Sequence, residues 1–395
     1  MQLSVLDLFA GCGGLSLGLA AAGFNVVAAC EKDKWAADSY EANHPGSRLL
    51  RADICELDND FWVSNFTGSI DVVAGGPPCQ GFSVSGKRQL GLVPSQNALV
   101  DEFLRIALLL KPPAILIENV NGFRTAFIRP GEKVLEYATR KLVRAGYSVF
   151  TSVLQAPDFG VPSLRSRFFL IALKHRHEVN PFPQPTYDGV RAPYLTVMDA
   201  ISDLPRIEAG QGTDGPQKYP GAASSSYQRQ MRKGSKAVYN HIAMNHTQRL
   251  VERFAAIPQG GSGFRFVQGG DDSQAVTVYK SNNQRLYADR PALCITANFQ
   301  STYIHPFLNR NLTAREAARL MTFPDGFIFK GKRTQMSSSL LKKEGRGHEN
   351  YLSQYNQIGN AVPPRLAECV GRALRAALLR HRASRSSQVN MELAG

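Results

Sequence analysis

Short apolar runs alternate with amphipathic stretches along the first 180 residues of the chain. The apolar runs have the length of buried strands, and the stretches between them have the spacing of helices that bury one face. The clearest helical stretch, residues 101–110, ends just before Pro112, where a helix is expected to stop. Six runs are predicted to be strands: residues 5–8, 25–29, 72–74, 115–117, 147–150 and 167–172. This alternation predicts an α/β fold with a mostly parallel, doubly wound sheet.

The pattern changes at about residue 181. From there Pro, Gly, Ser, Gln and Asn are frequent and the periodicity is weak, which predicts a second, irregular domain. A helical pattern returns at residues 365–374. We therefore expect a first domain at 1–180, a second domain with its hinge at 181–349, and a C-terminal segment at 350–395 that returns to the first. The polar tail after Arg382 is expected to be disordered.

Length and charge narrow the class of partner. A chain of 395 residues can hold a large core and two domains. It carries 46 Lys and Arg against 32 Asp and Glu, a net charge of +14. Residues 1–71 carry 4 basic and 10 acidic side chains, whereas residues 229–265 carry 7 basic and 1 acidic. A cofactor half and a half that faces nucleic acid would have this distribution, although ordinary solvated surface charge gives the same pattern.

The cysteines indicate neither a metal site nor a disulfide framework. They stand at positions 12, 30, 55, 79, 294 and 369, without paired metal-ligand spacing. No basic segment followed by an apolar core opens the chain, and no apolar run approaches the length of a membrane span. We expect reduced thiols in a soluble, cytoplasmic protein without a bound metal.

A thiol and a carboxylate each follow a predicted buried strand. Residues 71–76 lead into a glycine-rich loop with Cys79 at its mouth, where an α/β enzyme displays a nucleophile. Residues 114–120 deliver Glu118 at the end of another such run. Because ligands of open α/β sheets bind outside the carboxyl ends of the strands, these two side chains are candidates for one pocket.

A glycine turn after the first strand suggests a nucleoside cofactor. Residues 7–14 join a strand to a helix through Gly11, Gly13 and Gly14, which let the backbone approach a ligand. Ser16 stands where a dinucleotide fingerprint has its third glycine, which argues against a pyrophosphate. Glu31 is placed to bind a ribose diol, and Asp53 ends the next segment. A tight structural turn is the alternative interpretation of the glycines alone.

Six motifs occur in the order seen in cytosine-5 DNA methyltransferases, and the chain closely resembles the bacterial enzymes of restriction-modification systems. The motifs are residues 7–14, 78–83, 118–120, 165–167, 312–319 and 357–362. The resemblance covers nearly everything except the irregular middle. It implies the Rossmann-like sheet of S-adenosylmethionine-dependent methyltransferases in the catalytic and cofactor-binding domain 1–180. It also implies a smaller irregular, mainly β target-recognition domain in 181–349.

The resemblance implies methyl transfer from S-adenosylmethionine to carbon 5 of a cytosine flipped out of duplex DNA. Cys79 would add to carbon 6 of the ring, and Glu118 would hold or protonate ring nitrogen N3. Arg165 and Arg167 alternate along a strand and therefore face the same side, where one would meet the cytosine carbonyl and the other would be structural. Ser163 stands where the family usually has Gln, which puts a minor phosphate or base contact in doubt.

The resemblance also assigns the cofactor pocket. Phe9 would pack on the methionine moiety and adenine, Leu99 would form an apolar wall, and Asn360 with Val362 would meet the amino-acid end. Lys32 replaces an aromatic residue of many relatives, so adenine stacking is expected from Ile54 instead. The full cofactor set is Phe9, Gly11, Gly13, Gly14, Leu15, Glu31, Asp53, Ile54, Pro78, Leu99, Asn360 and Val362.

DNA contacts are expected from a loop and from the basic middle. Residues 80–97 are rich in Gly and Ser with Lys87 and Arg88 at the tip, a composition suited to closing over the DNA backbone. The histidines at 241 and 246 are expected to contact DNA or to be structural, not to bind metal. The predicted DNA-binding residues are Gln80, Ser83, Lys87, Arg88, Arg229, Arg232, Lys233 and Lys236.

Alternatives from other classes remain. The tRNA-modifying relatives share the Pro-Pro-Cys motif, but the long basic middle and residues 80–83 favour DNA. A non-catalytic DNA-binding protein on a decayed methyltransferase fold is disfavoured by intact Cys79 and Glu118, and a dehydrogenase by Ser16 and Cys79. We further expect a monomer at the nucleoid that protects host DNA from a restriction endonuclease without forming a stable complex with it.

Overall fold

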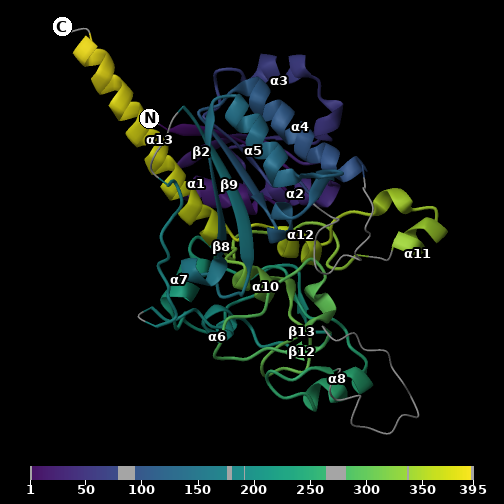
Figure 1. Ribbon diagram of the computed structural model, residues 1–395. Coiled ribbons are helices and arrows are strands. Elements are labelled where there is room, and N and C mark those ends of the chain that lie inside the picture. Colours follow the sequence, from purple (N-terminus) through teal and green to yellow (C-terminus); the bar gives the residue numbers. More distant parts are fainter. Residues whose placement is uncertain are drawn as a thin grey trace.

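The fold is described from a computed structural model of the chain (Figure 1). The described residues are 2–78, 94–175, 180–190, 192–263, 282–335 and 338–392, with the backbone alone at 94–98, 338, 348 and 383–392.

A seven-stranded sheet forms the first domain, in the order β3-β2-β1-β4-β5-β9-β8. Its strands are β1 (Leu3–Leu8), β2 (Phe24–Cys30), β3 (Arg48–Leu50), β4 (Val72–Gly75), β5 (Ala114–Asn119), β8 (Tyr147–Gln155) and β9 (Ser166–Lys174). The five strands from β3 to β5 are parallel, whereas β9 is antiparallel to both β5 and β8. All six predicted strands are present, and the mostly parallel sheet is confirmed. The sequence pattern missed β3, a three-residue edge strand in which only Leu50 is buried.

Helices cover both faces of this sheet (Figure 1). They are α1 (Gly14–Ala21), α2 (Lys34–Asn43), α3 (Asn59–Phe66), α4 (Pro94–Leu110), α5 (Val134–Arg144) and α13 (Pro364–Glu392). Successive residues of β1 serve opposite faces, because Leu6 packs in the cluster of α3, α4 and α5 while Val5 packs in that of α1 and α13. Gly18 lets α1 and α13 approach closely, since a Cβ there would lie 2.4 Å from the Cβ of Ala367.

The C-terminal tail is helical where the sequence suggested disorder. Helix α13 runs on to Glu392 and projects beyond the sheet (Figure 1). Its first half is anchored against α1 through Leu366, Val370 and Leu374, so that later turns add to a helix already nucleated. Arg382 also pairs with Asp71 at the start of β4. The expectation of a disordered tail immediately after Arg382 is therefore wrong for this backbone.

The middle domain is less β-rich than expected. Its strands form two-residue pairs, β10 (Gly212–Thr213) with β11 (His241–Ile242) and β12 (Gln284–Arg285) with β13 (Tyr303–Ile304). Its helices are α6 (Val197–Ile201), α7 (Ser226–Arg232), α8 (Gln248–Ala255), α10 (Ala314–Leu320) and α11 (Ser338–Lys343), and the C-terminal segment adds α12 (Gln354–Asn360). Over the described residues, a mainly β domain is therefore not what forms.

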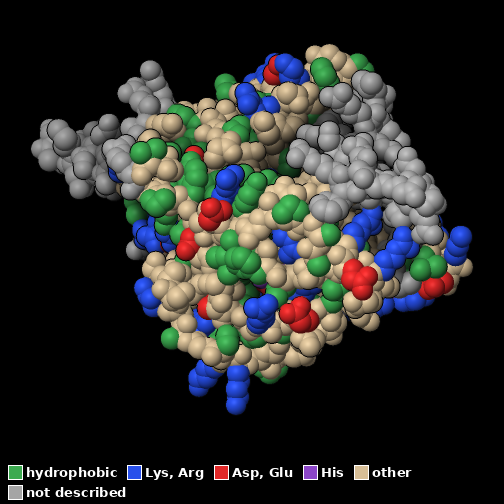
Figure 2. Space-filling model, turned by 90° about the horizontal axis from the view of Figure 1, so that it is seen from below, with side chains coloured by type: hydrophobic (Ala, Val, Ile, Leu, Met, Phe, Trp, Pro, Cys, Tyr) green, Lys and Arg blue, Asp and Glu red, His purple; other side chains and the backbone are tan. Residues whose placement is uncertain are grey.

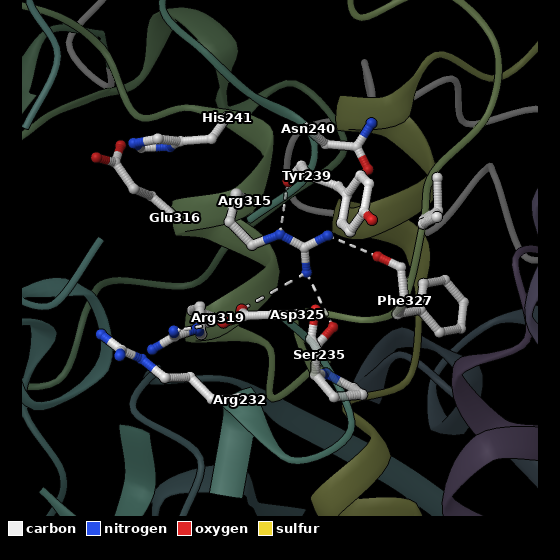
Figure 3. A network of polar contacts seen from close by, with 12 residues as sticks. Arg232, Ser235, Tyr239, Asn240, His241, Arg315, Glu316, Arg319, Asp325 and Phe327 are labelled. Carbon is white, nitrogen blue, oxygen red and sulfur yellow. Dashed lines mark hydrogen bonds and ion pairs between the residues drawn. The ribbon is translucent and has the colours of Figure 1, made fainter. Parts of the chain in front are cut away.

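In the middle domain, buried arginine side chains form hydrogen bonds to backbone carbonyl groups, which in a regular sheet would pair with a neighbouring strand. Arg315 and Arg319 of α10 are both fully buried, and Arg315 donates to three backbone carbonyl oxygens (Figure 3). Arg319 pairs with Asp325 at 2.6 Å and with Asp203 at 3.0 Å. The carbonyls that Arg315 satisfies belong to Tyr239, Pro324 and Phe327. Guanidinium groups thus satisfy buried polar atoms of irregular segments that have no strand partner.

Short elements complete the chain, and α12 bridges the domains. The remaining pieces are β6 (Phe127–Arg129), β7 (Glu132–Lys133), η1 (Ile54–Glu56), η2 (Asn121–Arg124), η3 (Ala156–Phe159), η5 (Phe299–Ser301) and η6 (Gly347–Glu349). Helix α12 lies in the segment expected to return to the first domain. It buries Tyr355 and Ile358 in the hydrophobic cluster of the middle domain. Gln357 of the same helix accepts a hydrogen bond from Ser39 of α2 at 2.6 Å.

Candidate active and cofactor site

Glu118, the predicted catalytic carboxylate, lies at the carboxyl edge of the parallel strands. Strands β4 and β5 lie side by side, so Glu118 comes next to the loop that follows Gly75. A Cβ on Gly76 would lie 3.0 Å from Glu118 Oε2, which shows how closely the carboxylate adjoins this loop. Asn119 Nδ2 donates to the carbonyl of Pro77 at 2.8 Å and so holds the backbone that leads to Pro78. Cys79 itself lies outside the described residues.

Glu118 is a buried carboxylate with one cationic partner. Its side chain is 9% exposed, and its Oε1 lies 2.8 Å from Arg167 Nε. Burial raises the pKa of Glu118 to about 7, and this desolvation outweighs the opposite effect of the Arg167 charge. A carboxyl group with this pKa can donate or accept a proton near neutrality.

The two arginines of the predicted pair have different surroundings. Arg167 meets Glu118, whereas Arg165 Nη2 donates to the carbonyls of Gly359 at 2.8 Å and Ala361 at 3.0 Å. Arg165 Nη1 also donates to the carbonyl of Ile295. Arg165 therefore joins the end of the sheet to the middle domain and to α12, while Arg167 faces the candidate catalytic carboxylate.

Cys294 and Asn119 are site residues that the sequence analysis gave no role. Cys294 Sγ lies 3.9 Å from Arg165 Nη1, and burial raises the pKa of its thiol. No local pattern marks Cys294, because a distant segment brings it here. Asn119 is adjacent to Glu118 in a quoted motif, so its position was a usable signal. Ser163 is fully buried and donates to the carbonyl of Leu293 at 3.3 Å, so its hydroxyl serves the contact between domains.

Hydrogen bonds to Glu31, which follows β2, join the end of that strand to the glycine turn. Gly11 N donates to Glu31 Oε2 at 2.8 Å, and Asp33 N donates to Glu31 Oε1 at 2.7 Å. Gly11 and Gly13 have φ angles of 58° and 96°, in the region that favours glycine. Burial raises the pKa of Glu31. An ionised carboxylate has acceptor capacity beyond these two bonds, which suits a ribose diol.

Close packing limits what can replace the helix-opening glycine. A Cβ on Gly14 would lie 2.4 Å from the carbonyl oxygen of Val362, so the turn touches the segment after α12. Val362 and Leu15 are buried in the cluster of α1 and α13, whereas Asn360 is exposed. The turn and the 360–362 segment are thus brought together from opposite ends of the chain.

The remaining predicted cofactor residues range from an exposed ion pair to a buried side chain. Lys32 Nζ pairs with Asp53 Oδ2 at 2.8 Å, and the pKa of Asp53 is lowered by its hydrogen bonds to Lys32 and Cys55 even though partial burial opposes this. Ile54 is buried at 3% exposure. Phe9, Pro78 and Leu99 are half-buried.

Asp33 is a further residue that the sequence analysis passed over. Its side chain caps α2 by accepting from Ala36 N at 2.9 Å, and it accepts from Leu352 N at 2.8 Å. An acidic residue just before a helical pattern is a usual capping signal. The second bond could not be foreseen, because Leu352 is more than 300 positions away.

The predicted DNA-binding residues divide into exposed and structural ones. Arg229, Lys233 and Lys236 are exposed. Arg232 pairs with Asp203 at 2.5 Å, donates to the carbonyl of Gly221 at 2.7 Å, and lies over a tyrosine ring. Its guanidinium is thereby engaged within the middle domain. Figure 2 shows Lys and Arg side chains spread over the lower face, with acidic groups among them.

Other predicted contacts are structural or outside the described residues. His241 is fully buried between Thr313 Oγ1 at 2.9 Å and the carbonyl of Pro205 at 2.8 Å, which is a structural role. His246 Nε2 accepts from Asn311 N at 3.3 Å. Gln80, Ser83, Lys87 and Arg88 lie outside the described residues. The loop expected at 80–97 ends earlier than predicted, because α4 begins at Pro94.

The described part of the chain contains neither a metal-binding cluster nor a membrane-spanning helix. No group of three or more His, Cys, Asp or Glu side chains there could hold a metal ion. No helix there is long and apolar enough to cross a membrane.

Comparison with known proteins gives consistent matches. The model of the family described as C-5 cytosine-specific DNA methylase matches residues 3–376. The Type II methyltransferase M.DdeI of Desulfomicrobium norvegicum is 43% identical over 93% of this chain and 87% of its own length. The Type II methyltransferase M1.HphI of Haemophilus parahaemolyticus is 33% identical over 95% of this chain and 87% of its own length. A crystal structure of a DNA modification methyltransferase encoded within an Escherichia coli prophage superposes with a TM-score of 0.73 at 26% identity, covering 95% of this chain and 99% of that one.

Proposed function

This chain belongs to the C-5 cytosine-specific DNA methylase family, and we propose that Glu118 and Arg167 hold the target cytosine while Cys79 attacks it. The enzyme is a DNA (cytosine-5-)-methyltransferase of the restriction-modification type. S-adenosylmethionine supplies the methyl group for its reaction.

The observation that carries the mechanism is the position and pKa of Glu118. Carbon 5 of cytosine is a weak nucleophile until a group adds at carbon 6. The Cys79 thiolate would form a bond to carbon 6 while the Glu118 carboxyl, with a pKa raised to about 7 by burial, donates a proton to N3. Electron density then moves to carbon 5, which would take the methyl group from S-adenosylmethionine as the bond to sulfur breaks and S-adenosylhomocysteine is left. Loss of the carbon 5 proton to a base, departure of the thiolate and return of the N3 proton to the Glu118 carboxylate would restore the aromatic ring.

Arg167 is the arginine best placed to meet the cytosine. Its Nε pairs with Glu118, and a guanidinium retains further donors that can reach the carbonyl of the base. Arg165 is proposed to act as a scaffold because its donors already serve backbone carbonyls of two other segments. Asn119 would keep the Cys79 loop in place through Pro77.

The cofactor residues fit a nucleoside with an amino-acid tail. Glu31 would accept the ribose hydroxyls while its bonds to Gly11 and Asp33 fix its direction. Ile54 and Phe9 would contact the adenine, and the exposed Asn360 would meet the amino-acid end. A Cβ on Gly11 would meet none of the described residues within 4 Å, which leaves room among them for a ligand against the turn.

We propose phosphate contacts for the exposed Arg229, Lys233 and Lys236, and exclude Arg232 from that role. Closure of the loop after Cys79 over the DNA stays a prediction. We further propose that the enzyme acts as a monomer on the bacterial chromosome in the cytoplasm. Its methylation would protect that DNA from a restriction endonuclease without a stable complex between the two enzymes.

Covalent capture tests the proposed mechanism. Duplex DNA with 5-fluorocytosine at the target, incubated with the enzyme and S-adenosylmethionine, should give an adduct that survives a denaturing gel, because fluorine cannot leave as a proton does. Cys79→Ser should bind DNA and cofactor but form no adduct and lose methyl transfer. Bisulfite sequencing of DNA from cells that express the protein identifies the target site. Incubation of the enzyme with labelled S-adenosylmethionine and either duplex DNA or tRNA shows which nucleic acid is methylated. Turnover by Cys79→Ser would refute the nucleophile.

A further inference from the structure

A buried polar chain lies beneath the glycine turn, in a part of the first domain that the reaction chemistry leaves without a role. Asp7 of β1 and Ser16 of α1 are both fully buried, and Ser16 Oγ donates to Asp7 Oδ2 at 2.5 Å. The other oxygen, Asp7 Oδ1, has no hydrogen-bond partner within the described residues. Within the described part of the chain, the Ser16 hydroxyl is therefore the side-chain donor that compensates this carboxylate for its burial.

The chain continues through two further hydroxyl groups. Ser16 Oγ lies 3.1 Å from the hydroxyl of Tyr40 in α2, which in turn lies 3.0 Å from Ser47 Oγ. An ionised carboxylate only accepts, so with Asp7 ionised the Ser16 proton points to Asp7 and the Tyr40 proton is free to point to Ser16. The chain thereby links β1, α1 and α2, the elements on either side of the cofactor turn.

The same residues support the turn sterically. The rings of Tyr40 and His44 stack with their centroids 4.3 Å apart. Both rings press on Gly13, where a Cβ would lie 2.2 Å from His44 Nε2 and 2.9 Å from Tyr40 Cδ2. Gly13 has a φ of 96° and directly precedes α1. The conformation of the turn is thus set from below by α2 and from the side by Ser16.

We propose that Asp7, Ser16 and Tyr40 are positioning residues for the methyl donor, which hold the glycine turn in its cofactor-binding conformation. This inference rests on the proposed function, because it assumes that the turn binds S-adenosylmethionine. It also accounts for Ser16, which stands where dinucleotide-binding turns have a glycine. Here the position supplies a hydroxyl to the strand beneath in place of close contact with a pyrophosphate.

Kinetic measurements distinguish a positioning role from a purely structural one. If the Asp7–Ser16–Tyr40 hydrogen bonds only stabilised the fold, their loss would reduce the amount of active enzyme and hence kcat, at unchanged KM. If these hydrogen bonds position the turn, their loss raises the dissociation constant and the KM for S-adenosylmethionine, while kcat at saturating cofactor and the affinity for DNA stay near the wild-type values.

The test is titration calorimetry of the full chain with S-adenosylmethionine, together with steady-state kinetics. Ser16→Ala and Tyr40→Phe should each weaken cofactor binding, Ser16→Ala by about tenfold, which corresponds to about 1.4 kcal/mol for one lost hydrogen bond. The matched control is Tyr147→Phe. Tyr147 is a buried residue of β8, away from the turn, and its hydroxyl donates to the carbonyl of Pro112 at 2.8 Å. Removing this hydroxyl should leave the cofactor affinity unchanged.

The outcomes are distinct. Weaker binding of S-adenosylmethionine by Ser16→Ala and Tyr40→Phe, with unchanged binding by Tyr147→Phe, supports the proposal. Unchanged affinity and KM in folded Ser16→Ala and Tyr40→Phe overturn it. If Ser16→Ala does not fold, Tyr40→Phe decides alone, because it keeps the ring that packs on Gly13 and removes only the hydroxyl. Absence of S-adenosylmethionine binding by the wild-type protein would refute the proposed function instead.

Discussion

Arg167 Nε lies 2.8 Å from Glu118 Oε1, so the cation at the start of β9 pairs with the carboxylate at the end of β5. The antiparallel register, which sets Asn119 opposite Phe168, brings these two ends together. Burial still raises the pKa of Glu118 to about 7 despite the nearby charge. The pair therefore keeps a titratable proton at the edge of the sheet where the Cys79 loop begins.

Replacing Glu118 should alter both the rate and its pH dependence. Glu118→Gln keeps the size of the side chain but cannot transfer a proton, so kcat should fall by about 10²–10⁴-fold. Because the active form is the protonated carboxyl, wild-type activity that depends on it should decline as pH rises through about 7. Turnover between pH 6 and 9 checks this. A variant that keeps both the wild-type rate and its decline would contradict the assignment.

The two arginines should separate stability from catalysis. Arg165→Met leaves three backbone carbonyls without a donor and should lower the free energy of unfolding by about 3 kcal/mol. Arg167→Gln should preserve most of the stability, lose kcat, and raise the pKa of Glu118 further, because the cation that lowers it is gone. Urea unfolding and turnover measured on both variants decide the matter. The reverse ranking would show that their roles are exchanged.

Adjacent cations in α7 and after it should behave differently on DNA. Lys233→Ala, at an exposed position, should reduce the salt slope of DNA binding by about 0.9 and weaken all sequences alike. Arg232→Ala instead leaves buried Asp203 with one partner fewer and should mainly destabilise the protein. Binding titrations across salt concentration and thermal unfolding measure the two effects. A lower salt slope in folded Arg232→Ala would return that residue to the DNA contacts.

A domain graft should transfer the target sequence. Replacing residues of about 181–300 with those of a relative that has a different target should give the relative's specificity with nearly unchanged cofactor affinity. The graft must retain an acid at Asp203 and an arginine at Arg285. Arg319 pairs with the former, and Arg285 donates to the carbonyls of His305 and Leu308 outside the graft. Bisulfite sequencing identifies the methylated site. An active chimera with the original target would place recognition elsewhere.

The charge of Asp7 should make stability depend on pH. Burial raises its pKa from 3.8 to about 7, so the folded state binds more protons than the unfolded state between these values. Its contribution to stability is therefore greatest below pH 3.8 and is lost as pH rises through 7. Asp7→Asn carries no such charge and should gain more melting temperature relative to the wild type at pH 8 than at pH 5, because only part of the effect has developed at pH 5. Calorimetric scans at both values test this, and equal differences would exclude the effect.

The sequence by itself determined the sheet, the family and the methyl donor. Apolar runs of strand length recur in the first domain because both faces of a parallel sheet are buried, so six of its strands could be predicted from local pattern. The motifs were equally local: Glu118 and the glycine turn each occupy a few consecutive positions. The same logic failed for β3, which is too short and too exposed to leave a pattern.

Only the tertiary structure decided which of two similar residues does what. Arg165 and Arg167 look alike in sequence, and their difference comes from Gly359 and Ala361, nearly 200 positions away. Arg232 could be separated from Lys233 only by the position of Asp203. The middle domain hid its architecture because its buried guanidinium groups bond to carbonyls of distant, irregular segments, and such contacts have no periodicity along the chain.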